Sequence, residues 1–466
     1  MDTTSQSSEA PEPFRIAIIG AGPSGFYTAE HLLKTATVPI QIDLFDMLPT
    51  PYGLVRAGVA PDHEKIKNVT ARYDVVADRP EFRFFGNVEL GRHLSVDDLR
   101  SCYHQIVYTT GAQVDRELGI PGEDLPGSHS ATEFVAWYNG HPDFRDREFD
   151  LSQSAAAVVG VGNVAIDVAR ILARPVADLE KTDMADYAID ALRNSGVHTV
   201  YVLGRRGPAQ AAFTNPEAKE LGELEDVNVL VEPDEVELDD LTKEELEASP
   251  DRLTEKKVKT IQTWSTEGNR GGSKTIHFRF LVSPTEIIEK DGRVGAIRIV
   301  KNVLAKDSNG RVRPKATEET EVLPVGLVFR SVGYRGTAIP GVPFNDSWGV
   351  IPQADGRVTT EEGTVVLGEY TAGWIKRGPS GVIGTNKADA QATVDAMLAD
   401  MAEGRLLKPS RGSSAGISDL LSEKGVRWVS WEDWKRLNDL ECAAGGKLGR
   451  PRVKFTTREE MLEKLD

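Results

Sequence analysis

The chain has 466 residues, a formal net charge of −17 and 40% hydrophobic residues, a profile typical of a globular protein with two or three domains. The acidic excess argues against nucleic acid as the main partner, because a phosphate backbone needs clustered Lys and Arg. No apolar run reaches the roughly 18 residues that span a membrane. Residues 1–13 lack the basic and apolar regions of a secretory signal. We therefore expect a cytoplasmic protein with a disordered tail over residues 1–13.

Cysteine content limits the redox chemistry of the chain. Cys102 and Cys442 are far apart in sequence and belong to no C-x-x-C pair, which argues against a redox disulfide formed by neighbouring cysteines. Two cysteines are also too few for an iron–sulfur cluster held by four thiolates. Bound organic cofactors would have to carry any electron chemistry, and no metal site is predicted.

A first glycine-rich turn, GAGPSG over residues 20–25, follows an apolar strand predicted over residues 16–19. Gly20, Gly22 and Gly25 allow a tight turn, close approach to a pyrophosphate and close packing of the next helix, predicted over Ser24 to Thr35. The pyrophosphate would lie at the positive N-terminus of that helix.

Asp46 lies 21 residues after Gly25, at the end of a second predicted strand over residues 40–44. An acidic residue in this position can accept a hydrogen bond from a ribose hydroxyl. The alternative is an aspartate in a surface loop. The Pro- and Gly-rich stretch 48–56 predicts a rigid, irregular loop, and residues 106–112 predict a buried strand that ends where the chain crosses into a second domain.

A second glycine-rich turn, GVGNVA over residues 160–165, follows the apolar strand predicted over residues 155–159. A helix over residues 164–172 is expected next, then a charged insertion over residues 178–194 and a strand over residues 199–203. Two such turns, each between a strand and a helix, indicate two dinucleotides bound by one chain.

Arg205 and Arg206 follow the strand over residues 199–203. An NAD site would carry an acidic residue here, whereas two guanidinium groups suit the 2′-phosphate of NADP through bidentate contacts. The alternative is a pair of surface arginines. Arg205 lies 45 residues after Gly160, against roughly 20 in a minimal unit, so the insertion must loop out.

Further elements complete the expected domain organisation. A charged stretch over residues 234–257 predicts a solvated helix or loop, and residues 278–282 and 294–300 predict antiparallel strands. A helix over residues 388–401 is expected, and the three-residue spacing of Trp428, Trp431 and Trp434 suits a helical face packed on the body. The predicted units are residues 14–112, 113–330 and 331–466, the last returning to the first domain.

Seven blocks together resemble the adrenodoxin reductase group of ferredoxin–NADP⁺ reductases, and especially its actinobacterial branch. They are Gly20–Tyr27, Pro51–His63, Gly86–Gly91, Ile120–Leu125, Gly160–Ile171, Gly204–Phe213 and Gly373–Lys387. The resemblance implies two Rossmann-type domains of three-layer ββα architecture in the α/β class. The domain that binds NADP would be inserted in a discontinuous domain that binds FAD.

The resemblance also implies roles for individual residues. For FAD these are Ser24, Asp46, Leu54 and Val88, with Trp374 and the backbone of Gly381, Val382 and Ile383 over the isoalloxazine. For NADP they are Val161, Gly162, Asn163, Val164, Arg205, Arg206, Glu217 and Gly381. Asp46, where Glu is common, and Glu64 depart from the family's usual residues.

The implied reaction is hydride transfer between NADPH and FAD, followed by one-electron transfers to an iron–sulfur ferredoxin. His63 and Glu217 would lie near the nicotinamide as catalytic residues, although a lone histidine in a Pro-rich loop is otherwise often structural. Lys219 and Arg56 are candidates for a basic patch that faces the ferredoxin. Family analogy alone allows a cytochrome P450 chain downstream.

Three other functions are compatible with parts of the pattern. An NADPH-dependent flavin monooxygenase shares both glycine turns, although the block from Arg377 to Lys387 favours the reductase. A reductase subunit like that of glutamate synthase would carry cysteine clusters, which this chain lacks. A non-enzymatic dinucleotide sensor would bind NADP without rapid flavin reduction.

Overall fold

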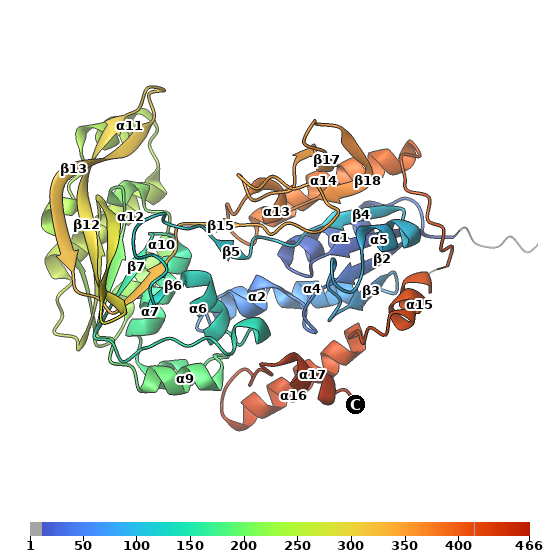
Figure 1. Cartoon of the computed structure of the whole chain (residues 1–466), viewed down its shortest axis with the longest axis horizontal. Helices are drawn as coiled ribbons and strands as arrows, with labels where there is room; N and C mark the ends of the chain where they lie inside the picture. Colours follow the sequence, from blue (N-terminus) through green and yellow to red (C-terminus); the bar gives the residue numbers. More distant parts are fainter. Residues whose placement is uncertain (1–11, 414) are drawn as a thin grey trace, which may run out of the picture.

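The computed structural model describes residues 12–413 and 415–466. The tail expected over residues 1–13 therefore lies almost wholly outside the described residues. Two bodies lie side by side along the long axis of the molecule (Figure 1). No helix in the described part of the chain has both the length and the apolar character needed to cross a membrane.

The first unit is built on a seven-stranded sheet whose central strands are parallel. In spatial order its strands are β16 (Gln353–Ala354), β17 (Arg357–Thr359), β18 (Val365–Thr371), β4 (Gln105–Tyr108), β1 (Phe14–Ile19), β2 (Ile40–Phe45) and β3 (Phe82–Phe85). β18 pairs with β4. The chain therefore returns to its first sheet after the second unit, as predicted for a discontinuous domain.

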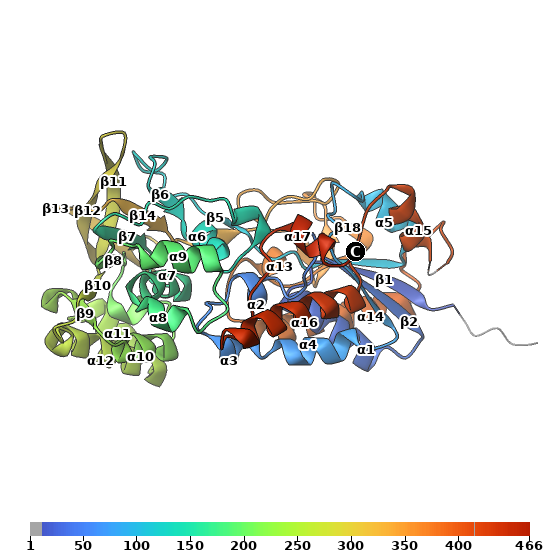
Figure 2. The same ribbon diagram turned by 90° about the horizontal axis from the view of Figure 1, so that it is seen from below.

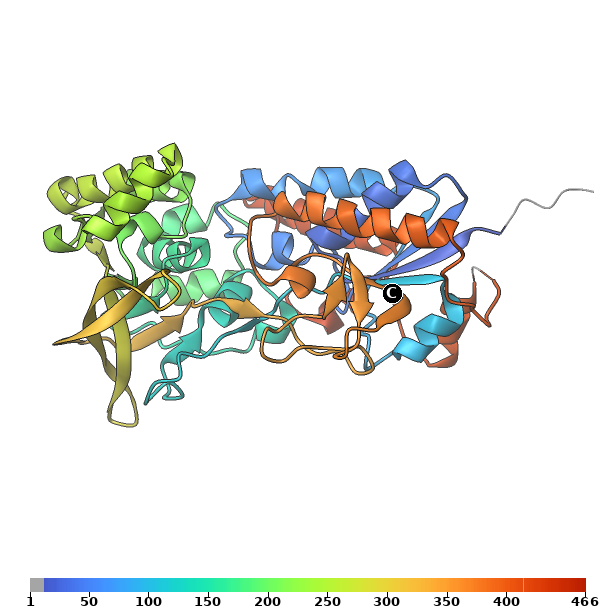
Figure 3. The same cartoon turned by 90° about the horizontal axis from the view of Figure 1, so that it is seen from above.

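Helices cover both faces of this sheet. One face carries α1 (Pro23–Thr35), α4 (Thr70–Ala77) and α14 (Thr385–Ala402), and Figure 3 shows the orange α14 beside the blue α1. The other face carries α5 (Val96–Cys102) and α15 (Gly416–Glu423). Three short helices, α2 (Leu54–Ala57), α3 (Glu64–Lys67) and α13 (Trp374–Arg377), lie in the connections. α2 falls within the stretch that was predicted to be wholly irregular.

The second unit has the predicted three layers. Its six-stranded parallel sheet runs β6 (Ser128–Ser130), β14 (Leu327–Arg330), β7 (Ala155–Val159), β8 (Thr199–Leu203), β10 (Lys274–Arg279) and β9 (Val227–Val231). One face packs against α6 (Ala131–Tyr138), α7 (Asn163–Ala173), α9 (Asp186–Arg193), α10 (Asn215–Glu223) and α12 (Arg252–Glu267). The other face packs against an antiparallel sheet of β11 (Val282–Lys290), β12 (Arg293–Lys306) and β13 (Val312–Leu323).

A two-stranded ribbon carries both crossings between the units. β5 (Val114–Asp115) leaves the first unit, and β15 (Tyr334–Arg335) returns to it. They pair antiparallel, so the outgoing and returning chains lie against each other.

The C-terminal extension lies along the first unit and reaches the second (Figures 1 and 2). It contains α16 (Trp431–Lys447) and α17 (Arg458–Glu463). Trp431 and Trp434 are buried and pack edge-on against Tyr52. Trp428 precedes the helix and lies against Phe85 instead, so the expected helical face holds two of the three tryptophans.

Two expectations for the second unit are wrong. Residues 278–282 do not form one strand paired with residues 294–300, because Leu281 has a left-handed backbone (φ 53°) that separates β10 from β11. β10 is parallel with its neighbours, whereas β11 pairs antiparallel with β12.

The charged insertion over residues 178–194 does not simply extend into solvent. It contains the second half of α8 (Val176–Leu179) and all of α9, which buries Ala188, Ile189 and Leu192. The stretch over residues 234–257 is largely exposed, as expected, and contains α11 (Asp240–Ala248).

Replacing Trp434 tests the packing of the extension on the first unit. Its side chain is 1% exposed, and its indole N–H donates to the Tyr52 hydroxyl at 3.2 Å. We expect W434A to lower the free energy of unfolding by about 3–5 kcal/mol, because a large cavity is left behind. W348A, at a tryptophan that is 71% exposed, should change it by no more than about 0.5 kcal/mol. Equal shifts in the thermal unfolding of both variants would contradict this packing.

Candidate functional site

The first glycine turn is shaped by close contacts at two of its three glycines. Gly20 has φ 109°, and a Cβ there would lie 2.7 Å from the carbonyl oxygen of Thr109. A Cβ on Gly25 would lie 2.2 Å from the Gly20 oxygen, so α1 can approach the turn only because Gly25 has no side chain. A Cβ on Gly22 would meet none of the described residues within 4 Å. The outer side of the turn is therefore open to a ligand.

Ser24 lies in the first turn of α1 and has a buried hydroxyl with no hydrogen-bond partner among the described residues. Buried polar atoms are normally satisfied, and the start of a helix favours an anion. An orphan hydroxyl beside an open glycine turn therefore fits a phosphate group. A Cβ on Gly373, just before α13, would lie 2.6 Å from the same hydroxyl oxygen.

Asp46 follows β2 and folds back onto the glycine turn. Its two carboxylate oxygens accept the backbone N–H groups of Ala21 and Leu48, both at 2.9 Å. Burial raises the pKa of Asp46 to about 6 against the lowering effect of these hydrogen bonds. The carboxylate therefore supports the turn directly, and each oxygen keeps capacity for a further donor.

The other residues expected around the first site have different exposures. Leu54 is 41% exposed, whereas Val88 is 3% exposed and belongs to the core. Val88 approaches the site through its backbone, because its N–H donates to the Asp46 carbonyl at 2.9 Å.

The block from Gly373 to Lys387 lies next to this turn. The Trp374 indole N–H donates to the Ser380 carbonyl at 3.1 Å, and its ring stacks on Tyr334 with centroids 5.9 Å apart. Gly381 has φ 79° and is exposed, as is Val382, while Ile383 packs against the first unit's core.

The second glycine turn repeats the design of the first. Gly160 has φ 135°, a Cβ there would lie 2.1 Å from the Ser331 oxygen, and Gly162 is open on its outer side. The Val161 carbonyl accepts the N–H of Ala212, and the Asn163 side chain accepts the N–H of Thr214. Val161 and Val164 are half-buried and pack on the core beneath the turn.

Arg205 and Arg206 lie beside this second turn. β7 and β8 are neighbours in the sheet, and the Gly160 N–H donates to the carbonyl of Leu203 at 2.9 Å. Neither arginine has an ion-pair partner within 4.0 Å in the described part of the chain. Burial, then the charges of Arg205 and Arg313, lower the pKa of Arg206. A concentration of positive charge without a protein partner fits an anionic ligand.

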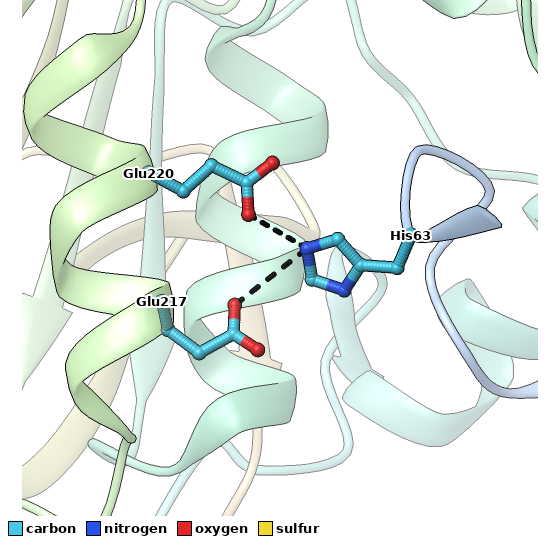
Figure 4. Close-up of side chains that lie close together, drawn as sticks. All are labelled: His63, Glu217 and Glu220. Atoms are coloured by element: carbon cyan, nitrogen blue, oxygen red, sulfur yellow. Dashed lines mark hydrogen bonds and ion pairs between the residues drawn. The ribbon is translucent and has the colours of Figure 1, made fainter. Parts of the chain in front are cut away.

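His63 and Glu217, predicted as catalytic residues, come from different units and meet (Figure 4). The His63 Nε2 atom lies 2.7 Å from a carboxylate oxygen of Glu220 and 3.8 Å from one of Glu217. Burial lowers the pKa of His63, but the hydrogen bond to Glu220 and the negative charges of Asp167 and Glu217 together outweigh it, so the pKa is raised overall. Glu217 and Glu220 are one helical turn apart on α10.

A buried arginine lies behind this histidine. The Arg170 side chain is 0% exposed and contacts Asp62 at 2.9 Å, Asp167 at 2.8 Å and Glu217 at 3.1 Å. Burial raises the pKa of Asp62, but the Arg170 guanidinium outweighs it and holds the pKa at about 2. Burial raises the pKa of Asp167 to about 7. No sequence pattern predicted Glu220, Arg170, Asp62 or Asp167 as members of this site. The available signal was an Asp and an Arg three residues apart inside the otherwise apolar helix α7.

Arg56 and Lys219 were the two basic candidates for a patch that faces the ferredoxin. The prediction that Arg56 is exposed is wrong. Its side chain is 10% exposed and pairs with the fully buried carboxylate of Glu441 at 2.5 Å. Lys219 is 75% exposed, and within the described residues its ion pair is with its helical neighbour Glu223, at 3.4 Å.

Known proteins resemble the chain over nearly its whole length. The family described as pyridine nucleotide-disulphide oxidoreductase matches residues 14–201. The NADPH-ferredoxin reductase FprA of Mycobacterium leprae is 45% identical, over 96% of this chain and 97% of that protein. The mitochondrial NADPH:adrenodoxin oxidoreductase of Arabidopsis thaliana is 38% identical, over 98% of this chain and 96% of that protein. The chain belongs to the NADPH-ferredoxin reductase family.

The solved structures agree with this membership. Mycobacterium tuberculosis FprA in complex with NADPH superposes with a TM-score of 0.92 at 44% identity, over 97% of this chain and 100% of that one. The predicted resemblance and the predicted pair of Rossmann-type domains are confirmed. As a member of the NADPH-ferredoxin reductase family, the chain is an oxidoreductase. Its cysteines, Cys102 and Cys442, are both free thiols.

Asp167 offers a pH test of the buried network. Its folded pKa of about 7 lies above the unfolded value of about 3.9. The folded state therefore binds more protons between these pH values, and this group lowers stability as the pH rises. Between pH 4 and pH 7, the free energy of unfolding of D167N should rise relative to that of the wild type by about 1–3 kcal/mol. D190N, at an exposed aspartate of α9, is the control for the loss of one carboxylate from the surface. A difference between D167N and the wild type that stays flat in thermal unfolding across this pH range would contradict the assignment.

Proposed function

We propose that the chain transfers a hydride between NADPH and FAD and passes the electrons one at a time to an iron–sulfur ferredoxin. One observation carries the proposal: each of the two units has an open glycine turn at a helix N-terminus, and His63 of the first unit lies 3.8 Å from Glu217 of the second. The relatives named for this activity resemble the chain over its full length.

The first unit fits FAD. Gly20, Gly22 and Gly25 form the pyrophosphate turn, the orphan hydroxyl of Ser24 donates to a phosphate oxygen, and Asp46 accepts from the ribose. Leu54, Val88, Trp374, Val382 and Ile383 would line the ring system. When bound, FAD supplies a two-electron acceptor for the hydride and a one-electron donor for the ferredoxin.

The second unit fits NADP(H). Val161, Gly162, Asn163 and Val164 form the turn beneath the pyrophosphate, and Gly381 approaches from the first unit. Arg205 and Arg206 bind the 2′-phosphate through charge-assisted hydrogen bonds.

His63 and Glu217 act where the two units meet. Glu217 is buried and positions the carboxamide of the nicotinamide, and the raised pKa of His63 lets it hold a proton at Nε2 against Glu220. Hydride transfer needs no nucleophile, so these residues orient the reactants and exclude water.

Three finer proposals accompany this function. The limits of the domains lie at residues 112–113 and 330–331, beside the ribbon of β5 and β15. The enzyme works in the cytoplasm. A cytochrome P450 chain is one consumer of the electrons downstream of the ferredoxin.

Anaerobic stopped-flow absorbance of the purified holoenzyme tests the proposed function. We expect NADPH to bleach the flavin band much faster than NADH does, and an oxidised ferredoxin then to restore it. A protein that binds no flavin on reconstitution would contradict the proposal. Bleaching without transfer to any ferredoxin, together with oxygen consumption that depends on a small substrate, would favour a flavin monooxygenase.

A double variant tests the role of Arg205 and Arg206. Loss of the charge-assisted contacts should raise the Kd for NADPH about 10- to 100-fold in R205A/R206A, with little change for NADH. R193A, at an exposed arginine of α9 in the same unit, should leave both constants unchanged. Titration of each variant with both coenzymes checks this. An equal loss of affinity for NADPH and for NADH would show that Arg205 and Arg206 do not bind the 2′-phosphate.

A further inference from the structure

The segment between α16 and α17, residues 448–457, runs along the junction of the two units. We call it the C-terminal strap. It has no helix or strand and is held by hydrogen bonds to both units. In Figure 1 the end of α16 lies near α9 of the second unit, and the Arg450 side chain contacts Asp186 at the start of that helix at 2.5 Å.

Lys454 is the centre of the strap. Its side chain is 1% exposed, and its ammonium group has acceptors from three residues in two units. The contacts are with a carboxylate oxygen of Asp183 at 3.1 Å, with the carbonyl and the side-chain oxygen of Asn139 at 3.1 Å and 3.5 Å, and with the carbonyl of Arg56 at 3.3 Å. These acceptors satisfy all three N–H donors of a lysine. Burial holds the pKa of Lys454 well below its ordinary value, against the opposing charge of Asp183.

The same contacts fix both ends of the segment that carries His63. Arg56, in α2, is held through its carbonyl by Lys454 and through its guanidinium by Glu441 of α16. Lys67, the last residue of α3, donates to Asp183 at 2.7 Å. His63 lies between these two anchors, directly before α3. Lys454 and Asp183 together therefore link both ends of the stretch from residue 56 to residue 67 to the second unit.

We propose that Lys454 is a positioning residue, which fixes the His63 segment and thereby the alignment of the two cofactor sites. This inference rests on the proposed function. Lys454 acts through Arg56 and Asp183, and none of the contacts named here joins it to either glycine turn. Buried ion pairs seldom add net stability over apolar packing. The directional contacts of this cluster instead allow only one arrangement of the three chain segments that it joins.

The test compares K454M with wild-type holoenzyme in two measurements. Hydrogen–deuterium exchange should become at least about 10-fold faster for the amides of residues 56–67, because one anchor is lost. In stopped flow, the first-order rate constant for flavin reduction by NADPH should fall about 10- to 100-fold, as expected for small misplacements of reacting groups. The Kd for NADPH should change less than about threefold, because Arg205 and Arg206 are untouched.

Two variants complete the design. K447M changes an exposed lysine at the end of α16 and should behave as wild type in both measurements. D183N keeps the two carbonyl contacts of Lys454 but weakens the contacts of Asp183 with both Lys454 and Lys67. It should show the same changes, and it carries the test if K454M does not fold.

Unchanged exchange in folded K454M would overturn the proposal, and so would faster exchange with an unchanged reduction rate. A loss confined to the Kd for NADPH would overturn it as well. If the wild type itself is not reduced by NADPH, the proposed function fails, while the exchange measurement still reports whether the strap anchors the His63 segment.

Discussion

The buried guanidinium of Arg170 is the interaction on which the arrangement of the two units depends. It belongs to α7, the helix that follows the second glycine turn, and it binds Asp62 from the first unit through two hydrogen bonds of 2.9 Å. A charged group with 0% exposure must be paired, because leaving it unpaired costs several kcal/mol. The Asp62 carboxylate therefore reaches Arg170 in only one orientation of the first unit relative to the second. His63 follows Asp62 directly in the chain, so the pairing that joins the units also delivers the histidine to Glu217 and Glu220.

The two glycine turns show how one local design serves two ligands. In both, a strand ends at a glycine with positive φ and a second glycine leaves the outer side open. The difference lies at the end of the neighbouring strand, where the first unit has Asp46 and the second has Arg205 and Arg206. Asp46 folds back onto the turn through backbone N–H groups, whereas the two arginines have no ion-pair partner in the described part of the chain. The choice of ligand is thus made by a few side chains outside the turn.

Local sequence patterns predicted much of this structure. The turns at residues 20–25 and 160–165 and the strand over residues 199–203 depend on glycine placement and apolar runs. They lie where the sequence placed them. The run over residues 278–282 was misread because hydrophobicity continues across Leu281, while the left-handed backbone that splits it leaves no compositional mark. The helix α9 was not predicted, because its charged residues mask the apolar pattern of its buried face.

The contacts of the site could not be read from the sequence in the same way. Arg170 and Asp62 meet only because the two units pack together, whereas Glu220 reaches Arg170 within the second unit. The separations of these residues along the chain carry no signal of either contact. His63 and Glu217 were placed through a family resemblance and not through spacing. Arg56 was expected on the surface because an arginine in a Pro- and Gly-rich loop is usually solvated, yet Glu441, 385 residues away, pairs with it.

An enzyme with two nucleotide sites in two units must keep them in one relative position, and apolar packing alone tolerates small shifts. Here the junction is made of directional contacts instead. Arg170 with Asp62, Lys67 with Asp183, and Lys454 with two carbonyls each join segments from different parts of the chain. Each has a narrow geometric optimum and a high cost when broken, so together they resist both sliding and rotation. The C-terminal extension, which has no part in either glycine turn, belongs to the catalytic design for this reason.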